Sequence, residues 1–324
     1  MNIYVKSFLY SFIIAIFLFI FFIPLLRRIK FGQTIRKEGP KDHYSKAGTP
    51  TMGGIVIILA TVISFLYLRL KEIEIDKHYI LLLLMPLILY GILGFIDDYL
   101  IVVKKNNQGL TSRTKLFFQI IWAAFYFYVF LDKGLSSVVN IFGWKVDLKW
   151  GYGILILLML ISSSNAVNLS DGLDGLAGGL IIIALGVIII LSRYIEKEEI
   201  LIFSLCLLGA VLAFLCYNFK PAKIIMGDTG SLALGASLAN LFILLKMEVL
   251  LLVVGLVFII ETISVIIQVF YFKITKGKRI FLMAPLHHHY ELKGYSETEI
   301  DAGFWILGIL FGLLGLILGI TLLG

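Results

Sequence analysis

Charged residues are scarce in this chain of 324 residues, where Asp, Glu, Lys and Arg together make up 15% of the sequence. Soluble globular domains carry about 25% charged residues, so a water-soluble fold is excluded. Hydrophobic residues account for 60% of the chain, and the mean hydropathy is +1.00. Because a backbone in lipid must satisfy its own hydrogen bonds, and a helix does so within one segment, the sequence predicts an all-α polytopic integral membrane protein.

Cysteine is also rare, with two residues, Cys206 and Cys216. Both fall in one apolar stretch, where ten helical residues separate them by roughly 15 Å, which excludes a disulfide between them. No cleavage site of small residues follows the first apolar run, so we expect a retained span and not a signal peptide. The net charge of +7 does not indicate a nucleic-acid partner, because basic residues that flank apolar spans set membrane topology.

Ten apolar stretches have about the length of roughly 20 residues that a membrane-spanning helix needs. The chain shows neither an internal repeat nor a low-complexity tail, so we predict a single transmembrane domain over residues 1–324 in a lipid bilayer. The predicted spans lie at about 7–26, 52–70, 79–96, 116–132, 152–167, 176–192, 200–217, 230–246, 249–271 and 303–322.

Lys and Arg are concentrated on the side of the membrane that the chain reaches after its odd-numbered spans. The positive-inside rule assigns that side to the cytoplasm and both termini to the extracytoplasmic side. In the outer loop 133–151, apolar residues flank a Phe-Gly-Trp sequence at 142–144, which predicts a small hairpin. Trp144 and Trp150 are suited to anchor this loop at the membrane interface.

Five aspartates, Asp97, Asp98, Asp171, Asp174 and Asp228, lie at the cytoplasmic ends of predicted spans. Carboxylates near a bilayer are costly and mark functional sites, and clustered carboxylates are typical ligands of hard divalent cations. We therefore expect three separate segments to form one cation site that acts on a phosphorylated substrate. Adjacent helical residues point about 100° apart, so Asp97 and Asp98 should have different tasks. The alternative for this pair is that it only marks the membrane exit.

Asn168, Asp171 and Asp174 recur at a spacing of three residues. On a helical turn they would share one face and present two carboxylates and an amide to a nucleotide or a hydrated cation. The alternative is a capped helix N-terminus followed by a packing seam of small residues.

Asp228 stands between the apolar run 224–226 and a helix start rich in small residues, which makes it a candidate metal ligand. The N–H groups of the next three residues would form an anion site at that helix N-terminus, and the alternative is a plain Asp N-cap. The basic loop 39–54 contains Lys46 and is either a phosphate binder or an ordinary positive-inside loop. Lys115, at the start of the fourth span, is expected at the depth of the acids.

Three consecutive histidines occupy positions 287–289. Three adjacent side chains on a helix cannot all bind one ion, and the surrounding acids favour magnesium over zinc. Imidazoles instead suit phosphate contact and proton transfer. In the ninth span, Glu261, Ser264 and Gln268 share one face, for which we expect hydrogen bonds to neighbouring helices.

Five ordered motifs together carry a resemblance that covers nearly the whole chain. With them the sequence resembles the polyprenyl-phosphate N-acetylhexosamine-1-phosphate transferases. The first and last motifs favour, within that superfamily, the phospho-N-acetylmuramoyl-pentapeptide transferases (translocase I). The motifs are SKAGTPTMGG (45–54), FIDDY (95–99), NAVNLSDGLDGLA (165–177), NFKPAKIIMGDTGS (218–231) and APLHHHYE (284–291).

This resemblance implies an enzyme that moves phospho-MurNAc-pentapeptide from UDP-MurNAc-pentapeptide to undecaprenyl phosphate, giving lipid I and UMP, with Mg²⁺ as cofactor. It implies the bacterial cytoplasmic membrane as location, with the active site on the cytoplasmic side, and the small-residue spans allow a homodimer. The implied catalytic residues are Asp97, Asp98, Asp228 and His287, with one of the first two as candidate base for the lipid phosphate. The implied metal ligands are Asp228 and Asp171. The implied substrate-binding residues are Lys46, Thr51, Lys115, Asn168, Asp171, Asp174, Asn218, His288 and His289.

Two other functions stay open on the residues alone. A sister enzyme that passes GlcNAc-1-phosphate to the same lipid is the main alternative. A transporter is the remote one, because that class places its acids at mid-span and shows repeat symmetry, whereas the acids of this sequence lie at span ends and no repeat is visible.

Overall fold

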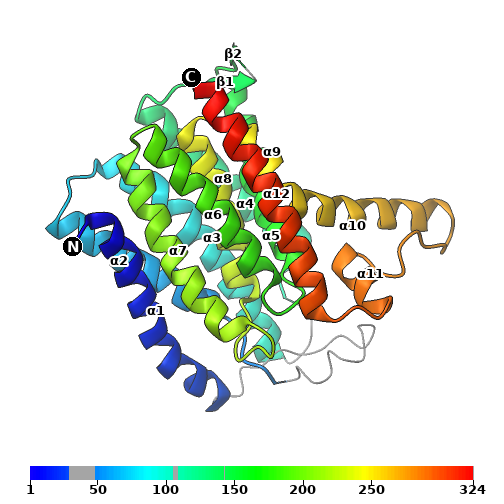
Figure 1. The fold of residues 1–324 in the computed structure, drawn as a ribbon. Helices are drawn as coiled ribbons and strands as arrows, with labels where there is room; N and C mark the ends of the chain where they lie inside the picture. Colours follow the sequence, from blue (N-terminus) through cyan, green and yellow to red (C-terminus); the bar gives the residue numbers. More distant parts are fainter. Residues whose placement is uncertain (29–47, 105–108, 142, 324) are drawn as a thin grey trace.

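The computed structural model describes residues 1–28, 48–104, 109–141 and 143–323 and is almost entirely helical (Figure 1). Lys46, a predicted phosphate ligand, lies outside the described residues. Ten described helices are long and apolar enough to cross a membrane, as predicted, and both cysteines are free thiols. The elements are α1 (Ile3–Arg28), α2 (Gly54–Lys71), α3 (Lys77–Lys104), α4 (Ser112–Asp132), β1 (Val138–Ile141), β2 (Trp144–Asp147), α5 (Gly151–Ser170), α6 (Leu176–Tyr194), α7 (Glu198–Asn218), α8 (Gly227–Leu245), α9 (Leu250–Val254), α10 (Leu256–Ile274), α11 (Leu286–Leu292) and α12 (Glu297–Leu323).

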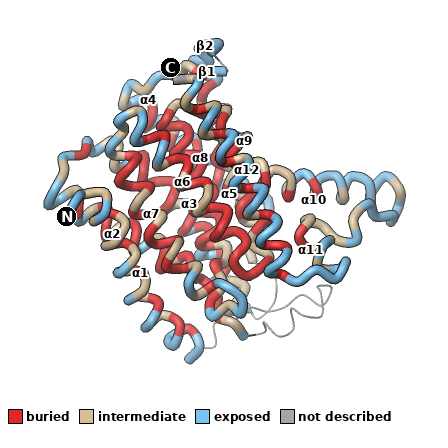
Figure 2. The backbone as a smooth tube through the Cα atoms, viewed as in Figure 1, coloured by how far each residue is buried: buried red, intermediate tan, exposed pale blue. Residues whose placement is uncertain are grey.

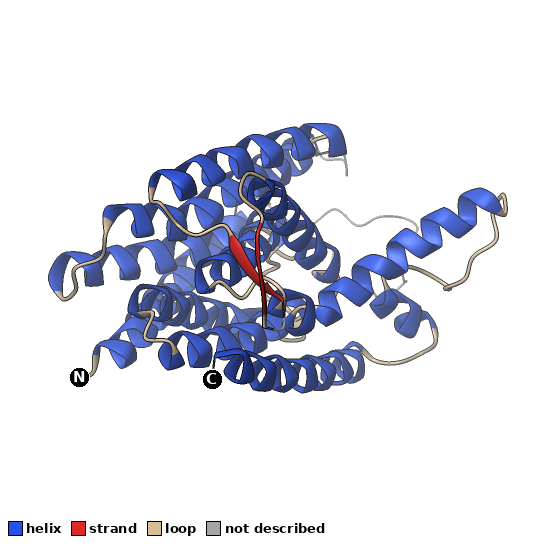
Figure 3. Ribbon diagram, turned by 90° about the horizontal axis from the view of Figure 1, so that it is seen from above, coloured by secondary structure: helices blue, strands red, loops and turns tan. Residues whose placement is uncertain are grey.

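The predicted ninth span, 249–271, is broken into α9 and α10 at Gly255. A Cβ atom at this position would lie 2.7 Å from the carbonyl oxygen of Leu251, so the turn of the chain favours glycine. Beyond it, α10 projects sideways from the bundle (Figures 1 and 3). The prediction of one continuous span is therefore wrong, because a glycine between apolar residues leaves the hydropathy of the segment uninterrupted.

Helix α8 forms the centre of the bundle, where every residue from Thr229 to Leu245 is buried, and Figure 2 shows this buried interior surrounded by exposed outer helices. Small residues let neighbouring backbones come close to it. A Cβ at Gly235 would lie 2.4 Å from the Ser163 carbonyl oxygen of α5, and one at Gly94 of α3 would lie 2.1 Å from the Asp228 carbonyl oxygen. Such close contacts drive helix association in lipid, where burying apolar surface contributes little.

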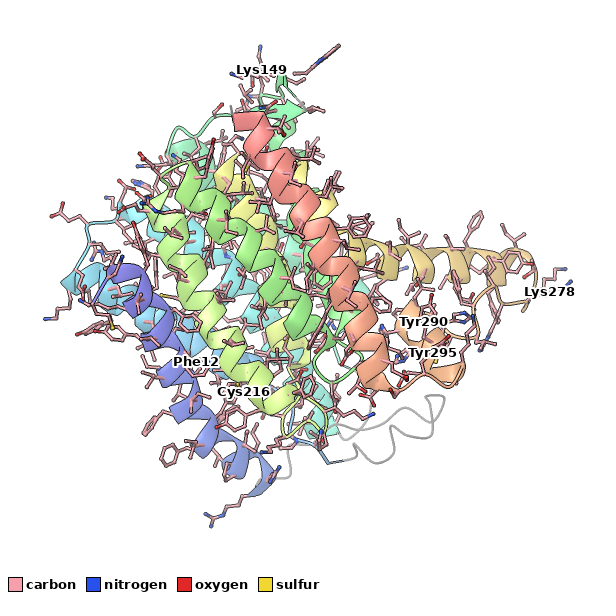
Figure 4. The ribbon with its side chains drawn as sticks, in the orientation of Figure 1. Phe12, Lys149, Cys216, Lys278, Tyr290 and Tyr295 are labelled. Atoms are coloured by element: carbon pink, nitrogen blue, oxygen red, sulfur yellow. The ribbon has the colours of Figure 1, made fainter. Side chains whose placement is uncertain are left out.

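The two ends of the bundle carry different connections. At one end the predicted hairpin forms from β1 and β2, which pair antiparallel with Ile141 opposite Trp144, and the side chains of Trp144 and Trp150 are exposed. Figure 1 shows the C-terminus beside this hairpin, while α1 begins at the left of the view and runs toward the opposite end of the bundle. Lys149 marks the hairpin end in Figure 4, and Lys278 lies beyond the far end of α10. That the hairpin end faces outward stays a prediction.

Candidate active site

Four helix ends meet at the end of the bundle opposite the hairpin. The hairpin joins the end of α4 to the start of α5, so the start of α4 and the end of α5 lie together at the other end. There the ammonium of Lys115 lies between two carboxylates, with its Nζ 2.6 Å from Asp228 Oδ2 and 2.9 Å from Asp97 Oδ2. The structure thus brings together residues from α3, α4 and α8 that lie up to 131 positions apart in the chain, as expected from the sequence.

Both carboxylate oxygens of Asp228 are held by side chains from neighbouring helices. While Oδ2 faces Lys115, Oδ1 accepts a hydrogen bond of 2.8 Å from Asn168 Nδ2, at the end of α5. The same Nδ2 lies 2.8 Å from the hydroxyl oxygen of Ser231, one turn further along α8. Asp228 is therefore oriented before any ligand arrives, which is the condition for an efficient binding or catalytic carboxylate.

Asp98 has a different task from its neighbour Asp97, as the helical geometry predicted. Its carboxylate accepts hydrogen bonds from the backbone N–H groups of Asp228 and Thr229, both at 3.0 Å, and from the Thr229 hydroxyl at 2.7 Å. A carboxylate there caps α8 and interacts favourably with its positive end. The prediction that the N–H groups of residues 229–231 bind an anion is therefore corrected. The Thr229 N–H already donates a hydrogen bond to the Asp98 carboxylate.

Asp97 is 3% exposed and is enclosed by the chain that precedes α4. Its Oδ1 accepts a hydrogen bond of 2.5 Å from the N–H of Leu110. A Cβ at Gly109 would lie 2.3 Å from that same oxygen, so glycine is needed where the chain passes the carboxylate. The remaining oxygen, Oδ2, is the one that faces Lys115. Asp97 therefore presents one oxygen to the ammonium that also contacts Asp228, whereas Asp98 directs its oxygens to the N–H and hydroxyl groups at the start of α8.

The prediction that Asn168, Asp171 and Asp174 share a helical face is wrong. Helix α5 ends at Ser170, with Asp171 as its C-cap, and Gly175 turns the chain into α6 with a left-handed φ of +93°. Asp174 accepts a hydrogen bond of 3.0 Å from the N–H of Ala222, so it joins this turn to the segment that precedes α8. Glycines at 172 and 175 disfavour helix, so the regular spacing did not produce a shared face.

Asn218 and Thr51 complete the surroundings of the α8 N-terminus. Asn218 accepts a hydrogen bond of 2.9 Å from the Gly175 N–H and donates one of 2.9 Å to the Ile224 carbonyl. It is 3% exposed and fixes the segment between α7 and α8. A Cβ at Gly227 would lie 2.9 Å from Thr51 Oγ1, so Thr51 also lies beside the start of α8. Substrate contact by either residue stays a prediction.

Helix α11 carries the three histidines. His287 is fully buried, and its Nδ1 lies 3.1 Å from Glu261 Oε2 of α10, which confirms the interhelical hydrogen bond expected for Glu261. On its other side, a Cβ at Gly172 would lie 2.3 Å from His287 Nε2. His287 therefore connects α10 to the turn that begins with Asp171. Neither His287 Nε2 nor Glu261 Oε1 has a hydrogen-bond partner in the described part of the chain.

The other two histidines have local partners. His288 Nδ1 lies 2.6 Å from Glu291 Oε2, and His289 Nδ1 accepts a hydrogen bond of 3.1 Å from the Leu282 N–H. Burial, with a smaller contribution from the charge of Lys293, lowers the pKa of His289. A neutral imidazole is also what an accepting Nδ1 requires. The Nδ1 atoms of the three histidines thus contact three separate groups, while the rings of His287 and His288 pack against each other with centroids 4.2 Å apart.

Several residues of the site could not be assigned partners from sequence. The N–H of Leu110 and the hydroxyl of Thr229 hold the Asp97-Asp98 pair, and Gln119, one turn along α4 from Lys115, contacts α5. Lys115 and Gln119 are four residues apart and therefore share one face of α4. This spacing is the feature of the sequence that could have pointed to Gln119.

The donor atoms of the site suit a hard cation. Asp97 and Asp228 approach one ammonium from two helices, and carboxylate oxygens are the ligands that Mg²⁺ prefers. Among the described residues, no group of three or more His, Cys, Asp or Glu side chains is arranged to hold a metal ion. Mg²⁺ commonly uses one or two carboxylates and completes its shell with water and substrate phosphates, so the residues present fit such an ion.

Comparison with known proteins assigns the chain to a family. The family model described as glycosyl transferase family 4 matches residues 80–246, and signature 1 of phospho-N-acetylmuramoyl-pentapeptide-transferase matches residues 46–58. The chain is 52% identical to the phospho-N-acetylmuramoyl-pentapeptide-transferase of Geobacillus kaustophilus over 94% of both chains. It is 50% identical to that of Bacillus subtilis over 97% of both chains. The chain therefore belongs to the phospho-N-acetylmuramoyl-pentapeptide-transferase family.

Proposed function

We propose that the protein transfers phospho-MurNAc-pentapeptide from UDP-MurNAc-pentapeptide to undecaprenyl phosphate, producing lipid I and UMP for peptidoglycan synthesis. The relatives named above carry this transferase name at about half identity over nearly the full chain. The observation that carries the proposal is the group of Asp97, Lys115 and Asp228, from three helices, at the ends of membrane-spanning segments. Such a position serves a reaction between a soluble anionic nucleotide and a lipid phosphate.

Asp97 is the better placed of the two adjacent acids to act as the base. Asp98 directs its oxygens to the start of α8, whereas Asp97 Oδ2 faces the Lys115 ammonium that also contacts Asp228. In the proposed reaction, Asp97 accepts a proton from the phosphate of undecaprenyl phosphate. A phosphate oxygen then attacks the phosphorus that bears the sugar, the bond to the UMP phosphate breaks, and UMP leaves with the electron pair. The base and attacking oxygen must lie within hydrogen-bond reach.

Electrostatics explains the remaining side chains. Both substrates are anionic, so their approach requires positive charge at the site. Lys115 supplies one such charge beside Asp228. We infer that Asp228, with Asp171 at the end of α5, would hold Mg²⁺. Bound Mg²⁺ supplies the charge that neutralises the donor diphosphate and its leaving group. His287 would orient the turn that contains Asp171, because its ring contacts Gly172.

An apolar cavity between α5, α8, α9 and α10 supports a lipid acceptor. Its volume is about 240 Å³, and its walls include Phe242, Leu252, Phe258 and Ile259. Apolar walls of this kind suit an isoprenoid chain and disfavour a charged sugar nucleotide. The protein would act in the bacterial cytoplasmic membrane with the site facing the cytoplasm, where sugar nucleotides are available. A homodimer is compatible with its exposed apolar helices.

The experiment that tests the proposal is UMP release by the purified protein in detergent with undecaprenyl phosphate and Mg²⁺. Reaction with UDP-MurNAc-pentapeptide is expected, and UDP-GlcNAc should give no UMP above background. Release from UDP-GlcNAc alone would reject the proposal in favour of the sister activity. Parallel detection of the lipid-linked sugar separates transfer from simple hydrolysis of the nucleotide.

A further inference from the structure

Gln119 forms a second connection between α4 and α5, one helical turn from Lys115. The side chain is 1% exposed. Its Nε2 lies 3.3 Å from the Ser164 hydroxyl oxygen, and its Oε1 accepts a hydrogen bond of 3.2 Å from Asn165 Nδ2. Both ends of the amide are therefore bound to α5. A buried amide that is hydrogen-bonded at both ends to the same neighbouring helix fixes the two helices in one relative position.

The spacing of these residues matches that of the candidate active site. Lys115 and Gln119 are four residues apart on α4, and Asn165 and Asn168 are three residues apart on α5, so each pair shares a helix face. Lys115 and Asn168 donate hydrogen bonds to the two carboxylate oxygens of Asp228. Gln119 and Asn165 form a hydrogen bond with each other. The α4–α5 contact thus has two adjacent levels, and the one through Gln119 lies deeper in the bundle.

Helix α4 is less buried than its neighbours α3 and α5, so its position depends more on individual contacts. In the membrane-spanning part of α4, 28% of the residues are buried inside the protein, whereas in α8 the share is 94%. Helix α5, by contrast, is fixed on α8, because Ser163 Oγ donates a hydrogen bond of 2.7 Å to the Gly235 carbonyl where the two backbones are in close contact. A sparsely packed helix can rotate about its axis, and rotation of α4 would move Lys115 away from Asp228.

We propose that Gln119 is a positioning residue that fixes the rotation of α4, so that the ammonium of Lys115 stays between Asp97 and Asp228. The effect on turnover rests on the proposed function, because it requires the carboxylates and Lys115 to act on the substrates. The effect on the position of Lys115 does not, because it concerns the protein alone. The two parts can therefore be tested separately.

Reactivity of Lys115 tests the position directly. The Lys115 side chain is 21% exposed, so acetic anhydride can acetylate it in the detergent-solubilised protein, and mass spectrometry can follow the rate. Gln119→Met, which keeps the volume and removes both hydrogen bonds, is expected to raise the rate several-fold. Asn165→Ala removes one of these two hydrogen bonds from the α5 side and leaves the one to Ser164, so it should raise the rate by less. Acetylation of Lys115 at the wild-type rate in both variants would overturn the proposal.

Tyr126→Phe is the matched control for the loss of a buried hydrogen bond from α4. Tyr126 is fully buried seven residues further along the helix, and its hydroxyl donates a hydrogen bond of 2.5 Å to Asn240 of α8. This variant should lose stability but keep the wild-type acetylation rate of Lys115 and the wild-type kcat. An acetylation rate raised as much by Tyr126→Phe as by Gln119→Met would reduce Gln119 to a structural role and contradict the proposal.

Kinetics then test whether Gln119 acts through Lys115. Gln119→Met is expected to lower kcat by roughly 10- to 100-fold, the usual cost of displacing a group of an active site by about 1 Å. In a Lys115→Met background the same change should have little further effect, because coupled residues are not additive. An equal fold-loss in both backgrounds would contradict the proposal. If the wild-type protein releases no UMP, the proposed function fails, while the acetylation result still decides the position of Lys115.

Discussion

Each end of the bundle holds a partly buried lysine against carboxylates, but the charges balance at one end only. At the hairpin end, Lys246 Nζ lies 2.7 Å from Glu248 Oε1 and 2.6 Å from the Tyr152 hydroxyl oxygen, and Tyr152 also donates a hydrogen bond to Glu248. One cation there meets one anion. At the opposite end, Lys115 meets both Asp97 and Asp228. The second group therefore carries one more negative charge than positive.

The difference in charge separates a structural cluster from a candidate catalytic one. A buried charge is tolerated when it is paired and hydrogen-bonded. Burial lowers the pKa of Lys246, and the charge of Glu248 opposes that shift. The pair sets one positive charge against one negative charge, so it needs no further ion. The excess carboxylate beside Lys115 accepts a hydrogen bond from a neutral group, but the described residues show no second cation in contact with it. Asp98 does not add to the excess in the same way, because the N-terminus of α8 stabilises its charge. The site therefore favours an additional cation.

The largest effect is expected for Asp228→Asn. The amide keeps the size of the side chain but removes the charge beside Lys115 and the favoured metal ligand. UMP release should fall by roughly 10³-fold or more, which corresponds to the loss of a principal electrostatic group. The variant should still insert in the membrane and elute as a single species, as size-exclusion chromatography can establish. Turnover within tenfold of the wild type at ordinary Mg²⁺ concentration would rule out metal ligation by Asp228.

Magnesium removal should have a comparable but reversible effect. EDTA is expected to stop UMP release, and excess Mg²⁺ should restore it. A second readout uses the protein without substrates. An ion that binds the folded state raises the melting temperature, so Mg²⁺ should stabilise the wild type and leave Asp228→Asn unchanged. Equal Mg²⁺-dependent stabilisation of the two proteins would place the ion away from Asp228.

Gly172→Ala is expected to have an intermediate effect. A new Cβ would lie 2.3 Å from His287 Nε2, so either the buried ring or the turn beginning at Asp171 must shift. A fall in kcat of roughly tenfold is expected from such a displacement. Gly186→Ala is the matched control, since a Cβ there meets no atom within 4 Å. Similar kinetics for the two variants would show that the position of His287 does not affect turnover.

The sequence predicted most of the fold because lipid imposes simple rules on length and hydropathy. Apolar segments of sufficient length predicted ten spans, although the ninth begins at Leu256 and not at residue 249. The break at Gly255 could not be predicted in this way, because the direction of a chain after a glycine depends on the helices around it. Likewise, nothing in the sequence distinguishes the sideways course of α10 from an ordinary crossing of the membrane.

The candidate site was predictable in its composition but less so in its contacts. Acids at the ends of spans are costly, so Asp97 and Asp228 could be placed in one site before their distance was known. Their partners depend on tertiary structure. Asp98 binds the N–H groups at the start of α8, which no spacing in the sequence indicates. The regular spacing of Asn168, Asp171 and Asp174 was misleading, because glycines between the acids end the helix.

The smallest effect on activity is expected for Glu248→Gln, at the balanced end. UMP release should stay within about twofold of the wild type, because the cluster lies at the opposite end of the bundle from Asp228. Stability should nevertheless fall, since Lys246 loses its counter-charge. Breaking a fully buried ion pair costs about 3–5 kcal/mol. The Lys246 side chain is 31% exposed, so a loss of about 1–3 kcal/mol is expected, measured by thermal unfolding in detergent.

A double variant separates charge balance from packing in this cluster. Lys246→Met combined with Glu248→Leu removes both charges and keeps apolar volume, so it should recover most of the stability that Glu248→Gln loses. No pair of substitutions of this kind can restore turnover after Asp228→Asn, because that end of the bundle needs its excess negative charge to bind a cation. Recovery of activity in a variant without charge at both Lys115 and Asp228 would therefore contradict the distinction between the two ends.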